Sequence, residues 1–354
     1  MLCYAGGVLK LISAPATNER GPRYMEKALA AIHQANALRS PLSLEYGLHE
    51  GRVALFVRSL PSMEETVTGP IVASYPNCSL TGIEQDEPLP EETLPTGWET
   101  WTADLELVPE LFPILRHAQF EDTLNRNFAD PVSGILRAIK PDEHLQCRVE
   151  ITIAPTLPHR CHQAARAVKR LDREFFHHHH RLARYYAKHI TRSRRWLGAW
   201  LLGLIARRTA EPMRTSLETS TSRVHEREDD LQAASDKIGG HLFDARIRLI
   251  VVTSPEHHVA AVDRIRQMAG AFGAFTKSRL AKFRLGPIRR DSAPTHRVHS
   301  HRPVRSHTQG HGFLLSHEEL ATLWHFPHSL QVKAPQIKKT ESKRSEPPAN
   351  LPFA

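Results

Sequence analysis

Polar and hydrophobic positions alternate along several runs of the chain, and this period of two predicts β-strands. The runs Leu42–Leu48 and Arg52–Arg58 are separated by a short turn that contains Gly51, so we expect a β-hairpin there. Leu145–Ala154 and Ala245–Thr253 are the two strongest runs, and their alternation predicts a sheet with one solvated face. Weaker strand-like runs are Ser79–Glu84, Trp101–Val108 and Ala281–Leu285.

Other segments repeat their hydrophobic residues with helical spacing. The capping-box pattern, a serine with a glutamate three residues later, occurs at Ser62 and predicts a helix that runs toward Tyr75. The same pattern at Ser316 predicts a short helix that ends before Pro327. Further helices are expected at Tyr24–Leu38, Pro131–Ile139 and Pro255–Phe272.

Residues 159–240 separate the two strongest predicted strands and are helical in pattern almost throughout. Leu217, Val224, Leu231 and Ile238 recur every seven residues, a spacing that resembles a coiled coil. The pattern predicts two antiparallel helices that protrude from the sheet as a hairpin, since the insertion is long. The alternative is a helix pair that packs within the core.

Strands and helices alternate in both halves of the chain, which predicts an α+β protein. We expect two ferredoxin-like sandwich units, residues 1–125 and residues 126–288, with the helical hairpin inserted in the second. Residues 289–312 are rich in His, Arg, Ser and Pro and predict a disordered linker. Residues 313–354 are expected to form a short helix and a proline-rich junction.

The composition of the chain indicates how many domains to expect and which kinds of partner are favoured. The chain has 354 residues, 40% of them hydrophobic, which is enough for about two domains with real cores. Its net charge of +9 favours nucleic acid or an anionic lipid surface as a partner. The four cysteines form no CxxC pair, which indicates a reducing, cytoplasmic compartment. The apolar start of the chain is interrupted by Lys10, so we expect no cleaved signal peptide.

The sequence contains no motif of a known catalytic centre. It has no P-loop GxxxxGK[ST], no GxGxxG, no GxSxG and no HExxH, so we expect neither an enzyme nor a bound cofactor. The run His177–His180 occupies consecutive helical positions that face different directions, which indicates a solvated basic face. His159, Cys161 and His162 lack a second group of ligands at zinc spacing, so no metal site is expected.

The first helix of the insertion is strongly basic. Cations on one helical stripe can follow a phosphate backbone and give affinity without reading the base sequence. The alternative is a solvated face balanced by acidic residues on the partner helix, Glu226, Glu228, Asp229 and Asp230. The predicted DNA contacts are Arg166, Lys169, Arg170, Arg173, Arg181, Arg184 and Lys188.

An apolar stretch, residues 196–206, lies between the two helices of the insertion and is flanked by arginines. It is about half as long as a membrane-spanning helix. It predicts either a buried helix tip or a tip that binds a membrane surface or a partner, because Trp and Arg favour such interfaces. The residues of that tip are Trp196, Trp200 and Leu201.

The stretch from Gly312 to Pro327, followed by Val332–Pro335 and Glu346–Pro352, resembles the segment that precedes the motor domain in conjugative-transfer coupling ATPases of the TraD and HerA-like kind. Only this C-terminal signature is fairly specific. Weaker similarity to the amino-terminal module of that family lies at Leu42–Pro61, Tyr75-Pro76, Phe120–Asp122, Asp130-Pro131 and Phe243–Arg248.

The resemblance implies a type IV secretion coupling function whose ATP-driven movement of DNA resides in a hexameric motor that this sequence does not contain. No nucleotide-binding residue is therefore carried over. What it implies for this chain is a non-catalytic role in docking partners or DNA beside a P-loop motor ATPase, in an oligomer. Two alternatives remain: a stand-alone basic nucleic-acid-binding protein, and a peripheral membrane adaptor.

Overall fold

The computed structural model describes residues 8–13, 18, 20–82, 98–122, 127–128, 130–140, 142–175, 220–277, 280–291 and 312–327. Within these residues, ten strands form one large antiparallel sheet, and helices pack on it. A separate two-stranded ribbon pairs β6 (Glu121–Asp122) with β7 (Asn127–Phe128). The predicted mixture of helices and strands is confirmed at this level.

The first half of the sheet has the spatial order β2-β3-β1-β4. Its strands β2 and β3 form the predicted hairpin, and Glu50 and Gly51 in the turn have positive φ angles of 50° and 70°. Glycine adopts such angles without strain. The elements of this half are β1 (Val8–Ser13), α1 (Pro22–Ala35), β2 (Leu42–His49), β3 (Arg52–Ser59), α2 (Glu64–Ser74) and β4 (Ser79–Gly82).

The second half repeats the same spatial order, with its second, third, first and fourth strands side by side as β8-β9-β5-β10. The two halves join through β2 and β8, where Glu45 lies opposite Glu150. The elements of this half are β5 (Glu99–Val108), α3 (Val132–Ala138), β8 (Leu145–Pro155), β9 (Leu242–Thr253), α8 (His258–Ala271) and β10 (Lys282–Leu285). Short 3-10 turns lie at Pro61–Met63, His117–Phe120, Pro255–His257 and Phe272–Phe275.

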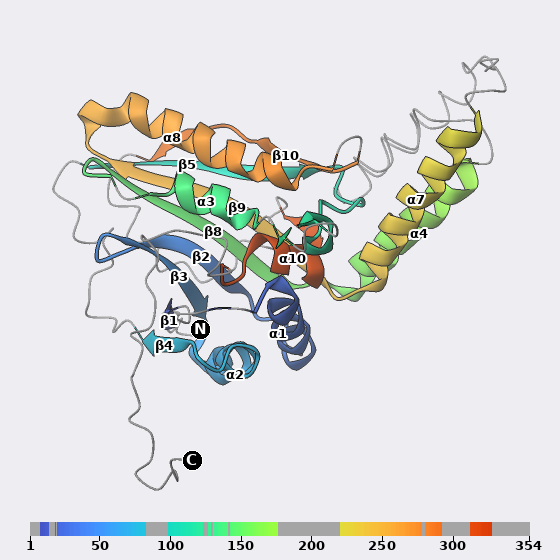
Figure 1. Ribbon diagram of the computed structural model, residues 1–354, viewed down its shortest axis with the longest axis horizontal. Coiled ribbons are helices and arrows are strands. Elements are labelled where there is room, and N and C mark those ends of the chain that lie inside the picture. The colour runs from blue at the N-terminus through green and yellow to red at the C-terminus, as the bar shows by residue number, and fades with distance from the viewer. Residues whose placement is uncertain are drawn as a thin grey trace, which may run out of the picture.

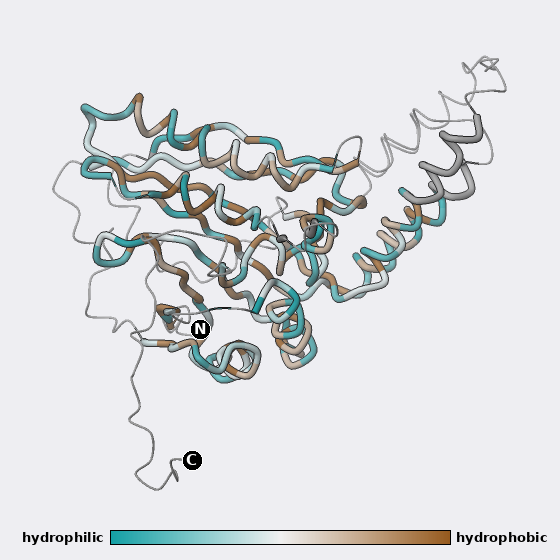
Figure 2. The backbone as a smooth tube through the Cα atoms, viewed as in Figure 1, coloured by the Kyte–Doolittle hydropathy of each residue, from teal (hydrophilic) through white to brown (hydrophobic). Residues whose placement is uncertain are grey.

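One hydrophobic cluster runs across both halves of the sheet. It contains side chains from α1, α2, α3, α8 and α10 (His317–Leu323). Along β2 the cluster takes Leu44 and Tyr46 but not the alternate residues Ser43 and Glu45, so it occupies one face of the sheet. Figure 2 shows brown, hydrophobic positions running along the central strands.

The segment between β8 and β9 begins as α4 (Pro158–Phe175) and ends as α7 (Ser220–Gly239). It connects β8 to β9, at the place where the first half has the tight turn of the β2–β3 hairpin. The described parts of α4 and α7 contact each other and extend side by side away from the sheet (Figure 1). We call these two helices the α4–α7 hairpin.

Several predicted boundaries differ from the structure. The apolar start of the chain supplies β1, a strand that pairs with both β3 and β4. The predicted first unit, residues 1–125, includes the run Trp101–Val108, but its strand β5 pairs with β9 and β10 of the second half. Because β5 follows the segment at residues 83–97, the change from one half of the sheet to the other comes before the predicted boundary at residue 125.

Two further predictions are wrong in detail. Ser62 does not cap a helix, because Pro61–Met63 form a 3-10 turn and the residue before α2 is Met63, which makes no side-chain cap. The predicted disordered linker begins too early, because Arg289–Asp291 form β11, which pairs with β5. The rest of that linker, residues 292–311, lies outside the described residues, as do residues 328–354 of the predicted junction.

Candidate functional site at the root of the helical hairpin

The C-terminal segment, residues 312–327, is part of the core. Its strand β12 (Phe313–Ser316) pairs with the start of β9, from Ala245 to Leu242. The predicted capping box is confirmed: Ser316 Oγ accepts from the Glu319 backbone N–H at 3.3 Å, and Glu319 Oε2 accepts from the Ser316 N–H at 2.8 Å. Both interactions satisfy N–H groups that the helix itself leaves unpaired, so they define the start of α10.

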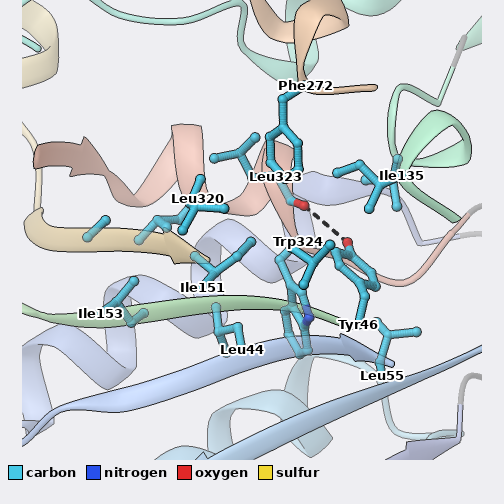
Figure 3. Close-up of a cluster of buried hydrophobic side chains, with 14 of the residues drawn as sticks. Leu44, Tyr46, Leu55, Ile135, Ile151, Ile153, Phe272, Leu320, Leu323 and Trp324 are labelled. Atoms are coloured by element: carbon cyan, nitrogen blue, oxygen red, sulfur yellow. Dashed lines mark hydrogen bonds between the residues drawn. The ribbon is translucent and has the colours of Figure 1, made fainter. Parts of the chain in front are cut away.

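The end of this segment lies against the middle of the sheet (Figure 3). Tyr46 donates its hydroxyl to the Leu323 carbonyl at 3.1 Å, and the Trp324 indole N–H donates to the Glu45 carbonyl at 3.3 Å. Burial raises the pKa of Tyr46 well above its usual value, so this hydroxyl remains a donor. These two contacts join α10 to β2.

The residues that follow Trp324 are also held from several elements. Tyr75 packs edge-on against Phe326 with ring centroids 4.4 Å apart, and His325 Nε2 lies 3.2 Å from Asp130 Oδ1. The side-chain amide of Asn18 donates to the carbonyls of Phe326 and Pro327, at 3.0 and 3.1 Å. The backbone at Pro327 is therefore fixed in place.

Side chains from four separate stretches of the chain meet at this segment. Tyr46, Tyr75 and Asp130 each contact a residue between Leu323 and Phe326. Phe243, from a fourth stretch, lies opposite Leu315 in the ladder between β12 and β9. These stretches are far apart in the sequence, and one structural unit brings them together.

Helix α7 is tied to the same segment by a buried ion pair. Lys237 is 2% exposed, and its Nζ lies 3.1 Å from Glu319 Oε1 and 3.1 Å from the Phe112 carbonyl oxygen. Glu319 Oε1 also accepts from the Ile114 N–H at 2.9 Å. Burial lowers the pKa of Lys237, and the negative charge of Glu319 opposes that shift. Such a pair holds α7 in one position, because separating it would leave an uncompensated charge.

Helix α4 is tied through Arg160, in its first turn. The guanidinium pairs with Asp244 on β9 and lies 3.3 Å from Glu110 Oε2. It also donates to the Gly312 carbonyl at 3.1 Å, and Glu110 Oε2 accepts from the Leu314 N–H at 3.1 Å. Burial raises the pKa of Glu110, while the charge of Arg160 lowers it.

A small hydrophobic cluster fills the space between the hairpin and the C-terminal segment. Its buried members are Leu111, Ala164, Ala167 and Leu314. Leu231 and Ile238 pack against them from α7, so these two members of the seven-residue repeat face α4. The small side chains of Ala164 and Ala167 allow the two helices to approach closely. Leu217 and the side chain of Val224 lie outside the described residues.

Three of the predicted DNA-contacting residues, Arg166, Lys169 and Arg170, are exposed on α4. His159 and His162 precede them and are exposed as well, with spacings of three and four residues that keep this group on one side of a helix. Arg173 lies in α4, but its side chain is not described. Arg181, Arg184 and Lys188 lie outside the described residues, as do the predicted tip residues Trp196, Trp200 and Leu201.

A scan against models of known protein families and a search of curated proteins found no match to this chain. Among the described residues, no group of three or more His, Cys, Asp or Glu side chains has a geometry that could hold a metal ion. No described helix is both long and apolar enough to cross a lipid bilayer.

Sequence reasoning missed the ionic contacts at the root of the hairpin. The sequence predicts Glu319 only as the partner of Ser316 in a capping box, and it predicts no role for Arg160, Glu110 or Lys237. Charged residues this far apart in sequence carry no local signal of their pairing. One signal was available: Lys237 directly precedes Ile238 of the seven-residue repeat, so it lies beside the packed face of its helix.

Proposed function

We propose that this chain is a non-catalytic accessory module of a type IV secretion or conjugation-like DNA translocase, which docks partners or DNA beside a P-loop motor ATPase. The observation that supports this role is that a buried ion pair and a hydrogen bond from an arginine join the α4–α7 hairpin to the C-terminal segment. Lys237 binds α7 to Glu319, and Arg160 binds α4 to the Gly312 carbonyl. The α4–α7 hairpin and the C-terminal segment, residues 312–327, are thus held in one fixed arrangement. Such an arrangement suits a scaffold that sets the distance between a partner bound at the hairpin and another bound near the C-terminal segment.

We further propose that each half of the sheet is a ferredoxin-like unit. The spatial order second-third-first-fourth, with a helix after the first and third strands, is the order expected of a β-α-β-β-α-β unit. On this proposal the α4–α7 hairpin replaces the turn between the second and third strands of the second unit. An insertion there leaves the sheet and its core intact, so the hairpin is free to serve binding.

For DNA, we propose contact along the exposed side of α4. Arg166, Lys169 and Arg170 are exposed there, and His159 and His162 extend the same side toward the sheet. A row of cations at helical spacing fits the phosphates of a nucleic acid and carries no base-reading group. This favours non-sequence-specific contact.

The two alternatives predict different binding partners for this chain. A stand-alone nucleic-acid-binding protein would bind DNA or RNA without any motor, with an affinity that falls steeply with salt. A peripheral membrane adaptor would use Trp196, Trp200 and Leu201 instead, and the double variant Trp196→Asp/Trp200→Asp would then lose flotation with anionic liposomes.

The proposal is tested by purifying the chain from its native cells and asking whether a P-loop ATPase accompanies it. We expect such an ATPase, and we expect its rate of ATP hydrolysis to change when the purified chain is added back. The matched variant is Lys237→Met, which removes the tie between α7 and Glu319 while leaving the exposed face of α4 unchanged. A chain that purifies alone, or only with nucleic acid that salt removes, contradicts the accessory role and supports the stand-alone alternative.

A further inference from the structure

Four histidine side chains meet where α7 joins β9. The ring centroids of His33 and His241 are 4.8 Å apart, and those of His241 and His317 are 5.2 Å apart. Glu26 connects them to a fourth ring, since its carboxylate lies 3.0 Å from His117 Nε2 and 3.5 Å from His317 Nε2. We call these five residues the histidine cluster; they come from α1, the turn His117–Phe120, the residue before β9 and the start of α10.

The cluster surrounds the connection between the hairpin and the sheet. Helix α7 ends at Gly239, and β9 begins at Leu242, so Gly240 and His241 form that connection. His33 Nε2 lies 3.0 Å from the Leu242 carbonyl oxygen, and the His317 backbone N–H donates to the His241 carbonyl at 3.0 Å. The His317 ring also lies against Gly240, where an added Cβ would come within 3.3 Å of it. The rings therefore hold the connection in place.

Burial, together with part of the surrounding charge, favours the neutral form of His33 and His317. Burial lowers the pKa of both His33 and His317, and His241 acts in the same direction on each. Arg39 lowers the pKa of His33 further, whereas Glu26 and Glu318 raise that of His317. The hydrogen bond from His117 is the largest cause that lowers the pKa of Glu26, against the effect of burial, with smaller contributions from His317 and Arg23.

We propose that the histidine cluster is an acid-sensitive switch that holds the connection between α7 and β9 in place at neutral pH and releases it when His33 and His317 become protonated. Neutral rings can pack at these distances, and one of them donates to the Leu242 carbonyl. Additional protons place positive charges on rings about 5 Å apart, around a single carboxylate that already contacts two of them. The switch does not depend on what the hairpin binds.

The direction of the pH effect follows from the lowered pKa values. We call the arrangement seen in the structure the closed state, and a state in which the connection between α7 and β9 is released the open state. In the open state His33 and His317 have their ordinary pKa of 6.5, so opening takes up protons below that pH. The closed state is therefore fully favoured above about pH 6.5 and loses stability as the pH falls from there toward the folded-state pKa values. For each proton taken up, the equilibrium constant for opening rises by up to about tenfold when the pH falls by one unit.

Amide hydrogen exchange of the full chain tests this switch, after correction for the pH dependence of intrinsic exchange. Between about pH 7.5 and about pH 5.5 we expect protection at residues 239–242 and in the last turn of α7 to fall by about tenfold or more, because opening takes up protons at His33 and His317. The centres of β8 and β9 should keep their protection. In the triple variant His33→Gln/His241→Gln/His317→Gln this response should disappear, because each ring makes its polar contact through Nε2 and a glutamine amide does not titrate. The amide N–H can donate to the Leu242 carbonyl and to Glu26, and at position 241 the amide oxygen can accept from the Gln34 side chain.

A matched control lies at the opposite end of β9, where the rings of His144 and His257 stack 4.2 Å apart. The variant His144→Gln/His257→Gln should keep the full response at residues 239–242. Equal protection at both pH values, a response that persists in the triple variant, or a response lost in the control would each overturn the proposal. If the triple variant does not fold, the single variant His33→Gln should show a reduced pH response, and an unchanged one would overturn the proposal.

Discussion

His325 Nε2 lies 3.2 Å from a carboxylate oxygen of Asp130, and both side chains are buried. The other ring nitrogen of His325 lies 2.8 Å from the Ala321 carbonyl oxygen, so both nitrogens face oxygen acceptors. The same oxygen of Asp130 also accepts from the Val132 N–H at 3.0 Å. The pair thereby joins the end of α10 to the start of α3, two helices from separate parts of the chain.

We expect His325→Leu to destabilise the protein by about 3 kcal/mol, because it leaves the buried Asp130 facing an apolar side chain. Chemical denaturation measures this loss. Asp130→Asn/His325→Leu should recover part of it, since the amide carries no charge. The control His159→Ala changes an exposed histidine and should stay within about 0.5 kcal/mol of the wild type. A His325→Leu variant as stable as the control would show that the pair contributes nothing to stability.

Lys237→Met should destabilise the protein by about 3 kcal/mol, because Glu319 would remain buried without its cation. The loss should be accompanied by faster amide exchange in the C-terminal turns of α7, which places the effect at the root of the hairpin. The matched control is Asp236→Asn, an exposed neighbour on the same helix, with an expected change below about 0.5 kcal/mol. Equal stability of the two variants would contradict the role assigned to the Lys237–Glu319 pair.

The third prediction concerns acid stability. Burial alone would raise the pKa of Asp104, but Arg246 and Arg248 outweigh burial and lower it. A carboxylate with a lowered folded-state pKa contributes stability that is present above its ordinary pKa of 3.8 and is lost as the pH falls through the folded-state pKa. Since Asp104 is partly exposed, solvent screening reduces this contribution to about 1 kcal/mol.

Asp104→Asn should therefore lower stability at neutral pH and have a smaller effect at about pH 3, as denaturation curves at the two pH values would measure. The control Glu106→Gln alters a more exposed carboxylate on the same strand, whose partner Arg284 is 60% exposed, and it should have little effect at either pH. An Asp104→Asn variant with the same acid sensitivity as the wild type would contradict the prediction.

The parts of the fold that the sequence predicts well are those with a regular and local pattern. The alternation in β2, β3, β8 and β9 depends only on which side of a strand faces the core, and the helical spacing of α1 likewise reflects its buried side. The capping box at Ser316 was predicted correctly because both of its partners lie within one turn. The same motif failed at Ser62, where Pro61 opens a 3-10 turn.

Other parts depend on contacts that no local pattern encodes. The run Val8–Ser13 is short and apolar, and only its pairing with β3 and β4 makes it a strand. Arg289–Asp291 has no hydrophobic residue at all, and β5 alone gives it strand structure. The ion pairs of Lys237 and Arg160 likewise join residues from separate elements, which the chain brings together only when the sheet has formed.

The last prediction concerns the exposed cations of α4. If Arg166, Lys169 and Arg170 contact phosphates, the variant Arg166→Gln/Lys169→Gln/Arg170→Gln should weaken binding to duplexes of different sequence by similar factors. Three lost phosphate contacts should also reduce the slope of log K against log salt by about 2.7. Fluorescence anisotropy at several salt concentrations measures both quantities.

The matched control changes exposed positions on the partner helix, as Gln232→Ala/Asp236→Ala, and should leave the slope unchanged. A slope that is equal in the wild type and the triple glutamine variant would mean that DNA is bound elsewhere or not at all. An affinity that falls for one duplex sequence alone would instead indicate contact with base edges, which glutamine and arginine satisfy differently. The two results are separable because phosphate contacts act on every sequence, whereas base contacts act on one.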